Sequence, residues 1–152
     1  AALGTILIIF GELIRMYSVG FIGSISRTRT DSLSDTLVTT GSFSIIRNPI
    51  YFGNFFIAIG FALFSGYLWF IILTIIFFFF QYYFIIKYEE FLLENKFGEQ
   101  YITYKSNVPC IIPKDLKLLN LAFPQLSLNE ILRSERSTLI GILVLWLILL
   151  IK

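Results

Sequence analysis

The sequence predicts an all-α membrane protein, a polytopic helical bundle with about four membrane helices and one cytosolic amphipathic helix. Of its 152 residues, 57% are hydrophobic and only 14% are charged, and the mean hydropathy is +0.80, which is unusual for a soluble domain. Several apolar runs are long enough to approach or exceed the roughly 30 Å of a hydrocarbon core. We expect one domain over residues 1–152, with a motif core at about 35–113 and a C-terminal helix at 127–151.

The first apolar run covers residues 1 to about 23 and predicts a transmembrane helix. Its charged residues, Glu12 and Arg15, are three positions apart and therefore share one helical face. They can form an ion pair that packs helices, or serve a cofactor or substrate, since buried charge in a membrane is often functional. Residues 24–48 are polar and without helical period, which predicts a long loop.

Two further membrane helices follow this loop. Pro49 is suited to the first position of a helix and Asn48 to its N-cap, so the second helix is expected from Pro49 to about Phe64. The third is expected from near Tyr67 toward Glu94. At about 1.5 Å per residue it is longer than the bilayer core is thick, so its final turns should project into water.

The last part of the chain predicts a short interfacial helix and a C-terminal helix. Residues 95–106 carry aromatic side chains at helical spacing, and Asn107, Val108 and Pro109 end that pattern. After a mixed stretch that we expect to lie on the membrane surface, Ser127 and Glu130 have the spacing of a capping box. The apolar part of the final helix is barely long enough to span a bilayer.

The distribution of basic residues predicts the topology. The turn between the second and third helices has no Lys or Arg, whereas the segments on either side of these helices are basic, with Arg27, Arg29, Arg47, Lys87, Lys96, Lys105, Lys114 and Lys117. The positive-inside rule places both basic segments in the cytoplasm. The polar stretch at 35–53 and the Glu89-Glu90 pair then lie at adjoining helix ends on one membrane face.

Composition also excludes several function classes. The net charge of +2 and the scattered cations argue against nucleic-acid binding. The absence of histidine removes the usual metal ligand and general base, and the single cysteine, Cys110, permits no intrachain disulfide. We therefore expect no metal site. The chain begins with Ala1 rather than methionine, which leaves room for processing and for helices upstream.

The polar residues at the cytoplasmic face each permit two interpretations. Glu89 and Glu90 can hold a cation, share a proton or accept hydrogen bonds, or they can form a solvated helix end. Arg47 can grip an anion at a helix N-terminus, or it can be an interfacial arginine. Tyr101 and Tyr104 fit a membrane-belt role, and Cys110 fits that of a small apolar residue.

The order of the motifs resembles the isoprenylcysteine carboxyl methyltransferase family and the related phospholipid N-methyltransferases. The resemblance rests on Leu37-Val38-Thr39-Thr40-Gly41-Ser42-Phe43, Arg47-Asn48-Pro49-Ile50-Tyr51-Phe52-Gly53, Glu89-Glu90 and Phe97-Gly98-Glu99-Gln100-Tyr101 with Tyr104. It spans roughly residues 10–113 and implies a membrane-embedded enzyme that uses S-adenosylmethionine.

The resemblance also implies which residues form the site. It assigns cofactor contacts to Thr36, Leu37, Val38, Phe43, Asn48, Pro49, Ile50, Tyr51, Glu89 and Glu90, and catalytic roles to Arg47 and Glu89. Asn48 and Phe43 stand where the family usually has histidine and tyrosine, and Ile85 stands where eukaryotic members have an arginine.

The implied reaction is methyl transfer to a lipid-like or prenylcysteine-like acceptor at the cytoplasmic membrane face. In this interpretation Glu89 orients the cofactor, Arg47 holds an anionic group, and Phe43 and Tyr51 wall the pocket. The expected partners are a lipid-like small molecule and membrane lipid. Two alternatives are a membrane reductase of the sterol-reductase type that uses NADPH, and a non-catalytic membrane scaffold.

Overall fold

The computed structural model describes residues 2–22, 36–114 and 123–151, and these ranges form an all-α fold. Its elements are α1 (Ala2–Ile22), the short 3₁₀ turn η1 (Ser42–Ser44), α2 (Pro49–Leu63), α3 (Leu68–Phe97), α4 (Glu99–Asn107) and α5 (Leu128–Ile151). Each of the five expected helices is present, within a few residues of its predicted bounds. Residues 24–35 of the expected first loop, including Asp35, and residues 115–122 of the expected surface segment lie outside the described residues.

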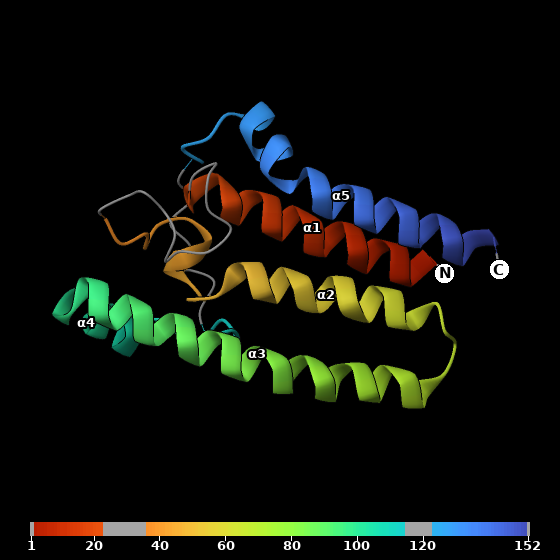
Figure 1. Ribbon diagram of the computed structural model, residues 1–152, viewed down its shortest axis with the longest axis horizontal. Coiled ribbons are helices and arrows are strands. Elements are labelled where there is room, and N and C mark those ends of the chain that lie inside the picture. The colour runs from red at the N-terminus through yellow and green to blue at the C-terminus, as the bar shows by residue number, and fades with distance from the viewer. Residues whose placement is uncertain (1, 23–35, 115–122, 152) are drawn as a thin grey trace.

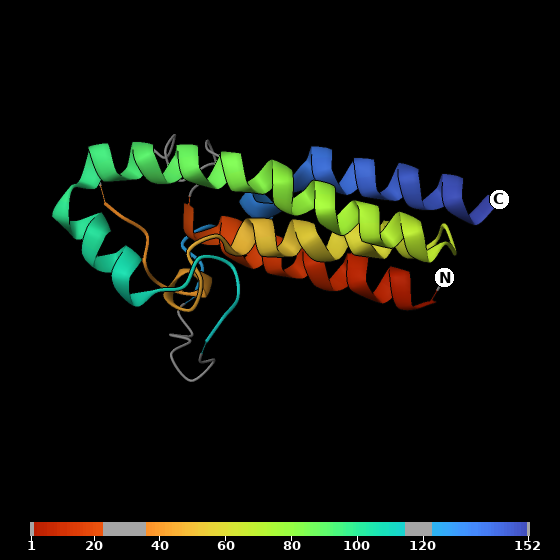
Figure 2. The same ribbon diagram turned by 90° about the horizontal axis from the view of Figure 1, so that it is seen from below.

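Four long helices lie side by side in the order α5, α1, α2 and α3 (Figure 1). α1 and α3 run in one direction, and α2 and α5 run in the other. Both ends of the chain and the α2–α3 turn lie at one end of the bundle. η1 and α4 lie at the opposite end, where α4 folds back from the end of α3 (Figure 2). The motif segments that follow α1 and α3 are therefore brought together at one end.

Two of the described helices are long and apolar enough to cross a membrane, α1 with 21 residues and α3 with 30. α2 is apolar but has 15 residues, as the expectation of a short second span requires. Half of the 18-residue apolar stretch of α1 is buried inside the protein, whereas only 11% of the corresponding stretch of α3 is buried. α3 therefore presents aromatic and aliphatic side chains to the surroundings around most of its circumference, as a lipid-facing helix does.

Glycines allow α1 and α2 to approach until their backbones touch. A Cβ atom added to Gly11 would lie 2.5 Å from the carbonyl oxygen of Gly53, and one added to Gly53 would lie 2.6 Å from that of Gly11. Gly4 and Gly60 repeat this contact closer to the α2–α3 turn, at 2.6 and 2.7 Å. Small residues at such positions let membrane helices pack closely, so this pair forms the centre of the bundle.

The helix ends show which local signals the fold uses. Gly98 has a φ of +53° and separates α3 from α4, so the predicted interfacial helix begins later than expected. The expected capping box is confirmed: the Ser127 N–H donates to Glu130 Oε2 at 2.9 Å, and the Glu130 N–H donates to Ser127 Oγ at 3.4 Å. Asn48 occupies the N-cap position of α2, but its side chain makes no capping hydrogen bond.

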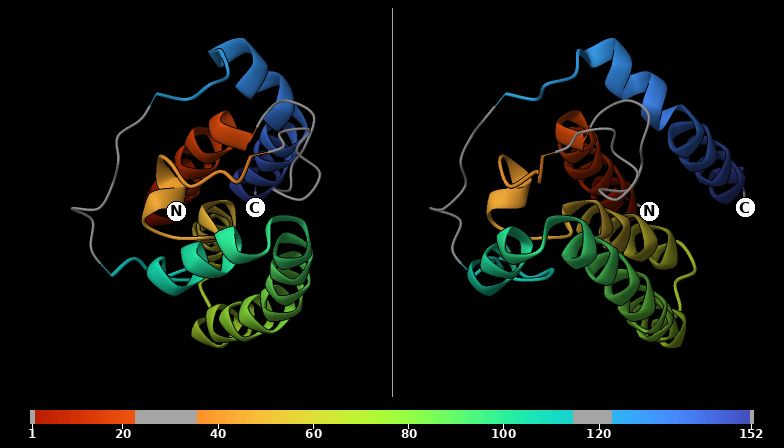
Figure 3. Two further views of the ribbon diagram at one scale, coloured as in Figure 1. Left: turned by 90° about the vertical axis from the view of Figure 1, so that its left-hand side faces the viewer. Right: turned by 60° about the vertical axis from the view of Figure 1, so that its left-hand side comes forward.

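α5 is fastened to α1 near both of its ends. The N–H groups of Gln125 and Leu126 donate to the carbonyl oxygen of Gly20 at 2.9 and 3.2 Å. Near the other end, Trp146 Nε1 donates to Thr5 Oγ1 at 3.0 Å. Figure 3 shows α5 beside α1 and on the side away from α3. The C-terminal helix is therefore an integral layer of the bundle.

Candidate functional site

Residues 105–111, together with Tyr104, contact the segment that precedes α2 and so connect that segment to the end of α4. The backbone N–H of Arg47 donates to Pro109 O at 2.8 Å, and that of Asn48 donates to Cys110 O at 3.1 Å. The Tyr104 hydroxyl donates to Phe43 O at 2.7 Å. These bonds satisfy backbone groups that precede a helix and would otherwise lack partners. The predicted meeting of the 35–53 stretch with the end of α3 is confirmed for the residues that the structure describes.

Arg47 is the central cation of this arrangement and is only 8% exposed. Its Nε and Nη2 donate to Glu90 Oε1 at 3.1 and 2.7 Å. Its Nη1 donates to the carbonyl oxygens of Lys105 and Val108 at 2.8 and 2.6 Å. The sequence indicated that Arg47 holds an anionic group of a ligand, but in this structure the anion that it holds is Glu90.

Glu90 is paired with two cations at once. It is 5% exposed, and its Oε2 accepts from Lys105 Nζ at 3.0 Å while Oε1 accepts from Arg47. Lys105 also contacts Glu94 at 2.5 Å. Burial alone lowers the pKa of Arg47, but the hydrogen bond and charge of Glu90 outweigh it, so the pKa lies above its ordinary value. Hydrogen bonds to Glu94 and Glu90 raise the pKa of Lys105 despite burial. Arg47 and Lys105 therefore remain charged near neutral pH.

Glu89 has a different environment from its neighbour. Its Oε1 accepts a hydrogen bond from the Tyr51 hydroxyl at 2.5 Å, and its side chain is half-buried. The ring of Tyr51 lies against that of Tyr82, with 4.7 Å between centroids. The Tyr82 hydroxyl accepts from Asn54 Nδ2 at 2.8 Å. Glu90 thus belongs to an ion cluster with Arg47, Lys105 and Glu94, whereas the neighbouring Glu89 accepts a hydrogen bond from Tyr51.

Asn48 contacts the only cysteine of the chain. Its Nδ2 donates to Cys110 O at 3.1 Å and reaches Cys110 Sγ at 3.4 Å. Burial raises the pKa of the Cys110 thiol, and the Arg47 charge offsets this only in part. The thiol is therefore neutral near pH 7. The amide of Asn48 therefore connects the loop after α4 to the start of α2 through a hydrogen bond.

The other residues singled out by the resemblance pack into two hydrophobic clusters or lie at the surface. Leu37 packs with Leu93, Tyr101 and Tyr104, and Phe43 packs with Phe21 and Ile22. Val38 and Ile50 border the second cluster, and Pro49 is fully buried. Thr36 is exposed. The structure therefore gathers Arg47, Asn48, Tyr51, Glu89 and Glu90 around polar contacts, and surrounds them with an apolar support.

A pocket of about 430 Å³ opens beside this cluster, between α3 and the segment that follows α4. Its lining combines aromatic, cationic and thiol groups: Arg47, Phe79, Tyr82, Tyr83, Ile86, Lys87, Glu90, Lys105, Cys110 and Ile111. Volumes of this order suit small ligands. Three cations and one carboxylate in the lining make it formally positive.

Sequence reasoning missed most of this lining. The contributing residues of α3 are 79, 82, 83, 86, 87 and 90, which recur every three or four positions and thus form one stripe of the helix. That stripe leads directly to Glu90 and was a readable signal. Ile111 and Lys105 carry no such signal, since only the fold brings their segment to α3.

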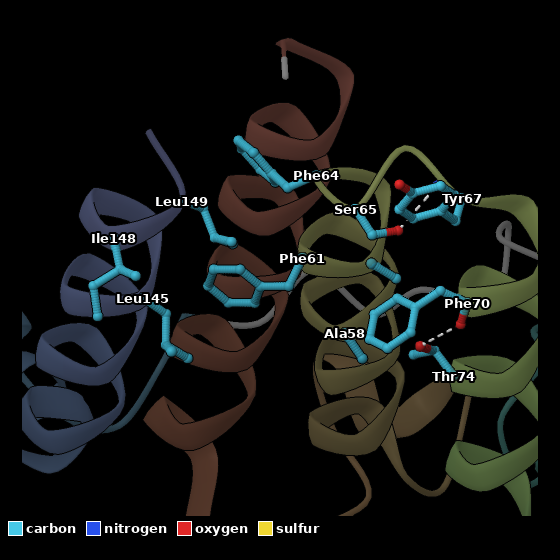
Figure 4. Close-up of a pocket in the computed structure, with 11 residues that line it drawn as sticks. Ala58, Phe61, Phe64, Ser65, Tyr67, Phe70, Thr74, Leu145, Ile148 and Leu149 are labelled. Carbon is cyan, nitrogen blue, oxygen red and sulfur yellow. Dashed lines mark hydrogen bonds between the residues drawn. The ribbon is translucent and has the colours of Figure 1, made fainter. Parts of the chain in front are cut away.

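A second pocket of about 760 Å³ lies at the opposite end of the bundle, between α2, α3 and α5 (Figure 4). Phe61 points toward Leu145 and Leu149 across it. Its polar groups are satisfied locally, because Thr74 donates to Phe70 O at 2.9 Å and Ser65 accepts from the Tyr67 N–H at 3.1 Å. The eleven lining residues include no charged side chain. The chemistry-bearing groups are at the Arg47 end.

The expected Glu12–Arg15 pair exists and has a third member from α5. Arg15 Nε lies 3.4 Å from Glu12 Oε2, and Arg15 Nη2 lies 2.7 Å from Glu135 Oε2. Arg15 Nη1 also donates to Asn54 Oδ1 of α2. Glu135 is completely buried. The sequence left open that Arg15 reaches a polar group of a neighbouring helix, but it did not indicate Glu135, because pairing across 120 positions depends on the fold.

Comparisons with known proteins bear on the family of the chain. A family model described as phospholipid methyltransferase matches residues 1–100. The chain is 34% identical over 119 residues to a protein-S-isoprenylcysteine O-methyltransferase of Xenopus laevis, covering 74% of this chain and 40% of that protein. It is 31% identical over 123 residues to the Rattus norvegicus protein of the same name, covering 74% and 41%. The chain thus spans about two fifths of these curated relatives. No solved structure matches.

Proposed function

Because the chain belongs to the phospholipid methyltransferase family, we propose that it uses S-adenosylmethionine to methylate a nucleophile on a lipid-like or prenylcysteine-like acceptor that enters from the bilayer. The observation that carries the proposal is the convergence of Arg47, Glu89 and Glu90 beside a 430 Å³ pocket in a chain of this family. When bound, the cofactor supplies an electrophilic methyl group on its sulfonium.

The donor set of the pocket fits such a cofactor. Phe79, Tyr82 and Tyr83 offer aromatic surface to a nucleobase. Lys87 and Lys105 offer charge to a carboxylate. Glu89 does not line the pocket itself, but it is linked to the pocket wall through Tyr51, whose ring packs against that of Tyr82, and a carboxylate can accept hydrogen bonds from hydroxyl or amino groups.

The remaining proposed contacts come from the segment before α2. We assign cofactor contacts to Thr36, Leu37, Val38, Phe43, Asn48, Pro49 and Ile50, together with Tyr51, Glu89 and Glu90. The side chains of Leu37, Phe43 and Pro49 are buried in apolar packing, so the contacts that we assign to these three residues are made by their backbone atoms.

The catalytic contribution of the chain is positional. Holding an acceptor in line with a reactive methyl group can supply several kcal/mol, up to about 7–11 kcal/mol in well-oriented reactions. Arg47 acts through Glu90, whose carboxylate it fixes from Nε and Nη2. Glu89 orients the cofactor, and Tyr51 fixes Glu89. We further propose that α1, α2, α3 and α5 cross the membrane as one domain and that this site faces the cytoplasm.

Calorimetric titration of the folded, detergent-solubilised chain with S-adenosylhomocysteine tests the proposal. We expect saturable binding, and we expect Glu89→Gln to weaken it by about tenfold, equivalent to about 1.4 kcal/mol. Glu99→Gln is the matched control, because Glu99 is exposed in the first turn of α4. No binding at millimolar ligand to protein shown to be folded would overturn the proposal.

The same titration separates the alternatives. A reductase of the sterol-reductase type predicts tighter binding of NADPH than of S-adenosylhomocysteine. A scaffold predicts binding of neither, and no effect of Arg47→Ala or Glu89→Ala on ligand binding or methyl transfer. The family match favours the methyltransferase.

A further inference from the structure

Polar side chains from four different helices form one continuous series of contacts across the bundle. Glu135 of α5 binds Arg15 of α1 at 2.7 Å, and Arg15 donates to Asn54 of α2. Asn54 then donates to the hydroxyl of Tyr82 on α3 at 2.8 Å. Tyr82 lines the 430 Å³ pocket. The series therefore leads from a buried carboxylate of the C-terminal helix to the wall of the proposed cofactor site.

The chemistry of these groups fixes the direction of every hydrogen bond in the series. An arginine can only donate, so Asn54 must present its Oδ1 to Arg15 and its Nδ2 to Tyr82. The Tyr82 oxygen then accepts, and its own hydrogen is left as a donor. Among the described residues Asn54 is the hydrogen-bond partner of this hydroxyl. A ligand in the pocket can supply the acceptor that the hydroxyl hydrogen lacks.

The position of Tyr82 also bears on Glu89. The ring of Tyr82 lies 4.7 Å from that of Tyr51 and stacks on that of Phe78 with 4.1 Å between centroids. Tyr51 in turn donates to Glu89. A displacement of Tyr82 would therefore move Tyr51 and, through it, Glu89, the residue that we propose to orient the cofactor.

Glu135 anchors the far end of the series. It is completely buried, its Oε2 binds Arg15, and its Oε1 has no hydrogen-bond partner among the described residues. Without Glu135, the remaining carboxylate paired with Arg15 among the described residues is that of Glu12, on the same helix at 3.4 Å. Arg15 would then be drawn along α1, and its hold on Asn54 would weaken. Glu135 lies beyond the part of the chain that the family model matches, which ends at residue 100.

We propose that Tyr82 is a binding residue for the methyl donor and that Glu135, Arg15 and Asn54 are positioning residues that hold its hydroxyl ready to donate. This inference rests on the proposed function. It makes α5 a working part of the site, in addition to a membrane anchor.

The first part of the test needs no ligand. Tyrosine labelled with ¹³C at Cζ reports the hydrogen bonding of each hydroxyl, and the Tyr82→Phe variant assigns the Tyr82 resonance by deleting it. We expect Glu135→Gln to shift this resonance. Glu130→Gln, the same change at an exposed position of the same helix, should leave it in place. An unmoved Tyr82 resonance in Glu135→Gln would overturn the positioning role.

The second part measures affinity for S-adenosylhomocysteine in the full chain. We expect Tyr82→Phe to weaken binding about tenfold and Glu135→Gln about threefold or more, with Glu130→Gln unchanged. If Glu135 acts through Tyr82, adding Glu135→Gln to Tyr82→Phe should weaken binding no further. If the double variant instead lost affinity by the product of the two single losses, the inference would be contradicted. Such independent losses are expected when Glu135→Gln only lowers the stability of the protein. Failure of the unmodified chain to bind would instead overturn the proposed function, while the resonance shift would still report on the series.

Discussion

Arg47 links three segments of the chain through one guanidinium group. It donates to Glu90 of α3 and to two carbonyl oxygens at the end of α4 and just after it. We expect Arg47→Ala to lower the free energy of unfolding by about 3 kcal/mol, at the low end for breaking a buried pair because Lys105 still neutralises Glu90. Thermal unfolding in detergent measures the loss.

The substitution Arg47→Lys separates charge from geometry. A lysine keeps the positive charge but cannot reproduce the planar fork that reaches a carboxylate and two carbonyls, so it should recover little of the loss. The double variant Arg47→Leu with Glu90→Leu should be less destabilised than Arg47→Ala, since it leaves no buried carboxylate. Lys114→Ala, at an exposed position, is the control. Full stability of Arg47→Lys would contradict this account.

Cys110 offers a second test at the level of a single residue. Because burial holds its pKa above the ordinary value of 9.0, little thiolate forms at neutral pH. Alkylation by iodoacetamide should therefore be slow at pH 7.5 and still rising beyond pH 9, whereas the unfolded chain should titrate at the ordinary value. As the chain has one cysteine, labelling is unambiguous. A rate that reaches its plateau below pH 8.5 in the folded protein would contradict the prediction.

At the scale of elements, the α1–α2 contact depends on the absence of side chains at the crossing. A methyl group on Gly11 would lie 2.5 Å from Gly53 O and 2.9 Å from Ile57 Cγ1, so the helices must separate. We expect Gly11→Ala to destabilise the protein by about 1–3 kcal/mol. Gly141→Ala in α5 is the matched control, because a methyl group there meets nothing within 4 Å. It should be neutral or stabilising by up to about 1 kcal/mol, since alanine favours helix. Equal Tm values for the two variants would show that the close approach is not needed.

The helix ends were predictable where the sequence signal lies within one turn of the end itself. Pro49 begins α2, and Ser127 with Glu130 begins α5, because proline geometry and capping act within one turn. The end of α3 was less predictable, since Gly98 interrupts a pattern that hydropathy alone carries through. Asn48 has the right residue type for a cap, yet its amide binds Cys110, a partner 62 positions away that no local pattern reveals.

At the scale of the whole molecule, the meeting of the Arg47 segment with Glu90 was predictable, because the predicted topology puts the start of α2 and the end of α3 on the same membrane face, where they can meet. Two contacts were not predictable: the pairing of Lys105 with Glu90, and that of Arg15 with Glu135. Both depend on how α4 and α5 fold back, and hydropathy does not specify which faces of these helices meet the bundle. The resemblance indicated candidate residues for a site, and the fold shows which of these candidates contact one another.

The bundle also makes a prediction about orientation in the membrane. α3 separates the α2–α3 turn from the segment after α4, so these must lie on opposite sides if α3 spans the bilayer. By the positive-inside rule, the basic residues predict that the Arg47 end lies in the cytoplasm. In a Cys110→Ser background, Tyr67→Cys should react with an impermeant maleimide in intact cells, since Tyr67 is exposed in the turn. Lys114→Cys, also at an exposed position, should react only after permeabilisation. Labelling of both from one side would show that α3 does not span, and the reverse pattern would place the site on the outer face. The reverse pattern would also change which water phase supplies the proposed methyl donor, because the pocket beside Glu90 opens at that end of α3.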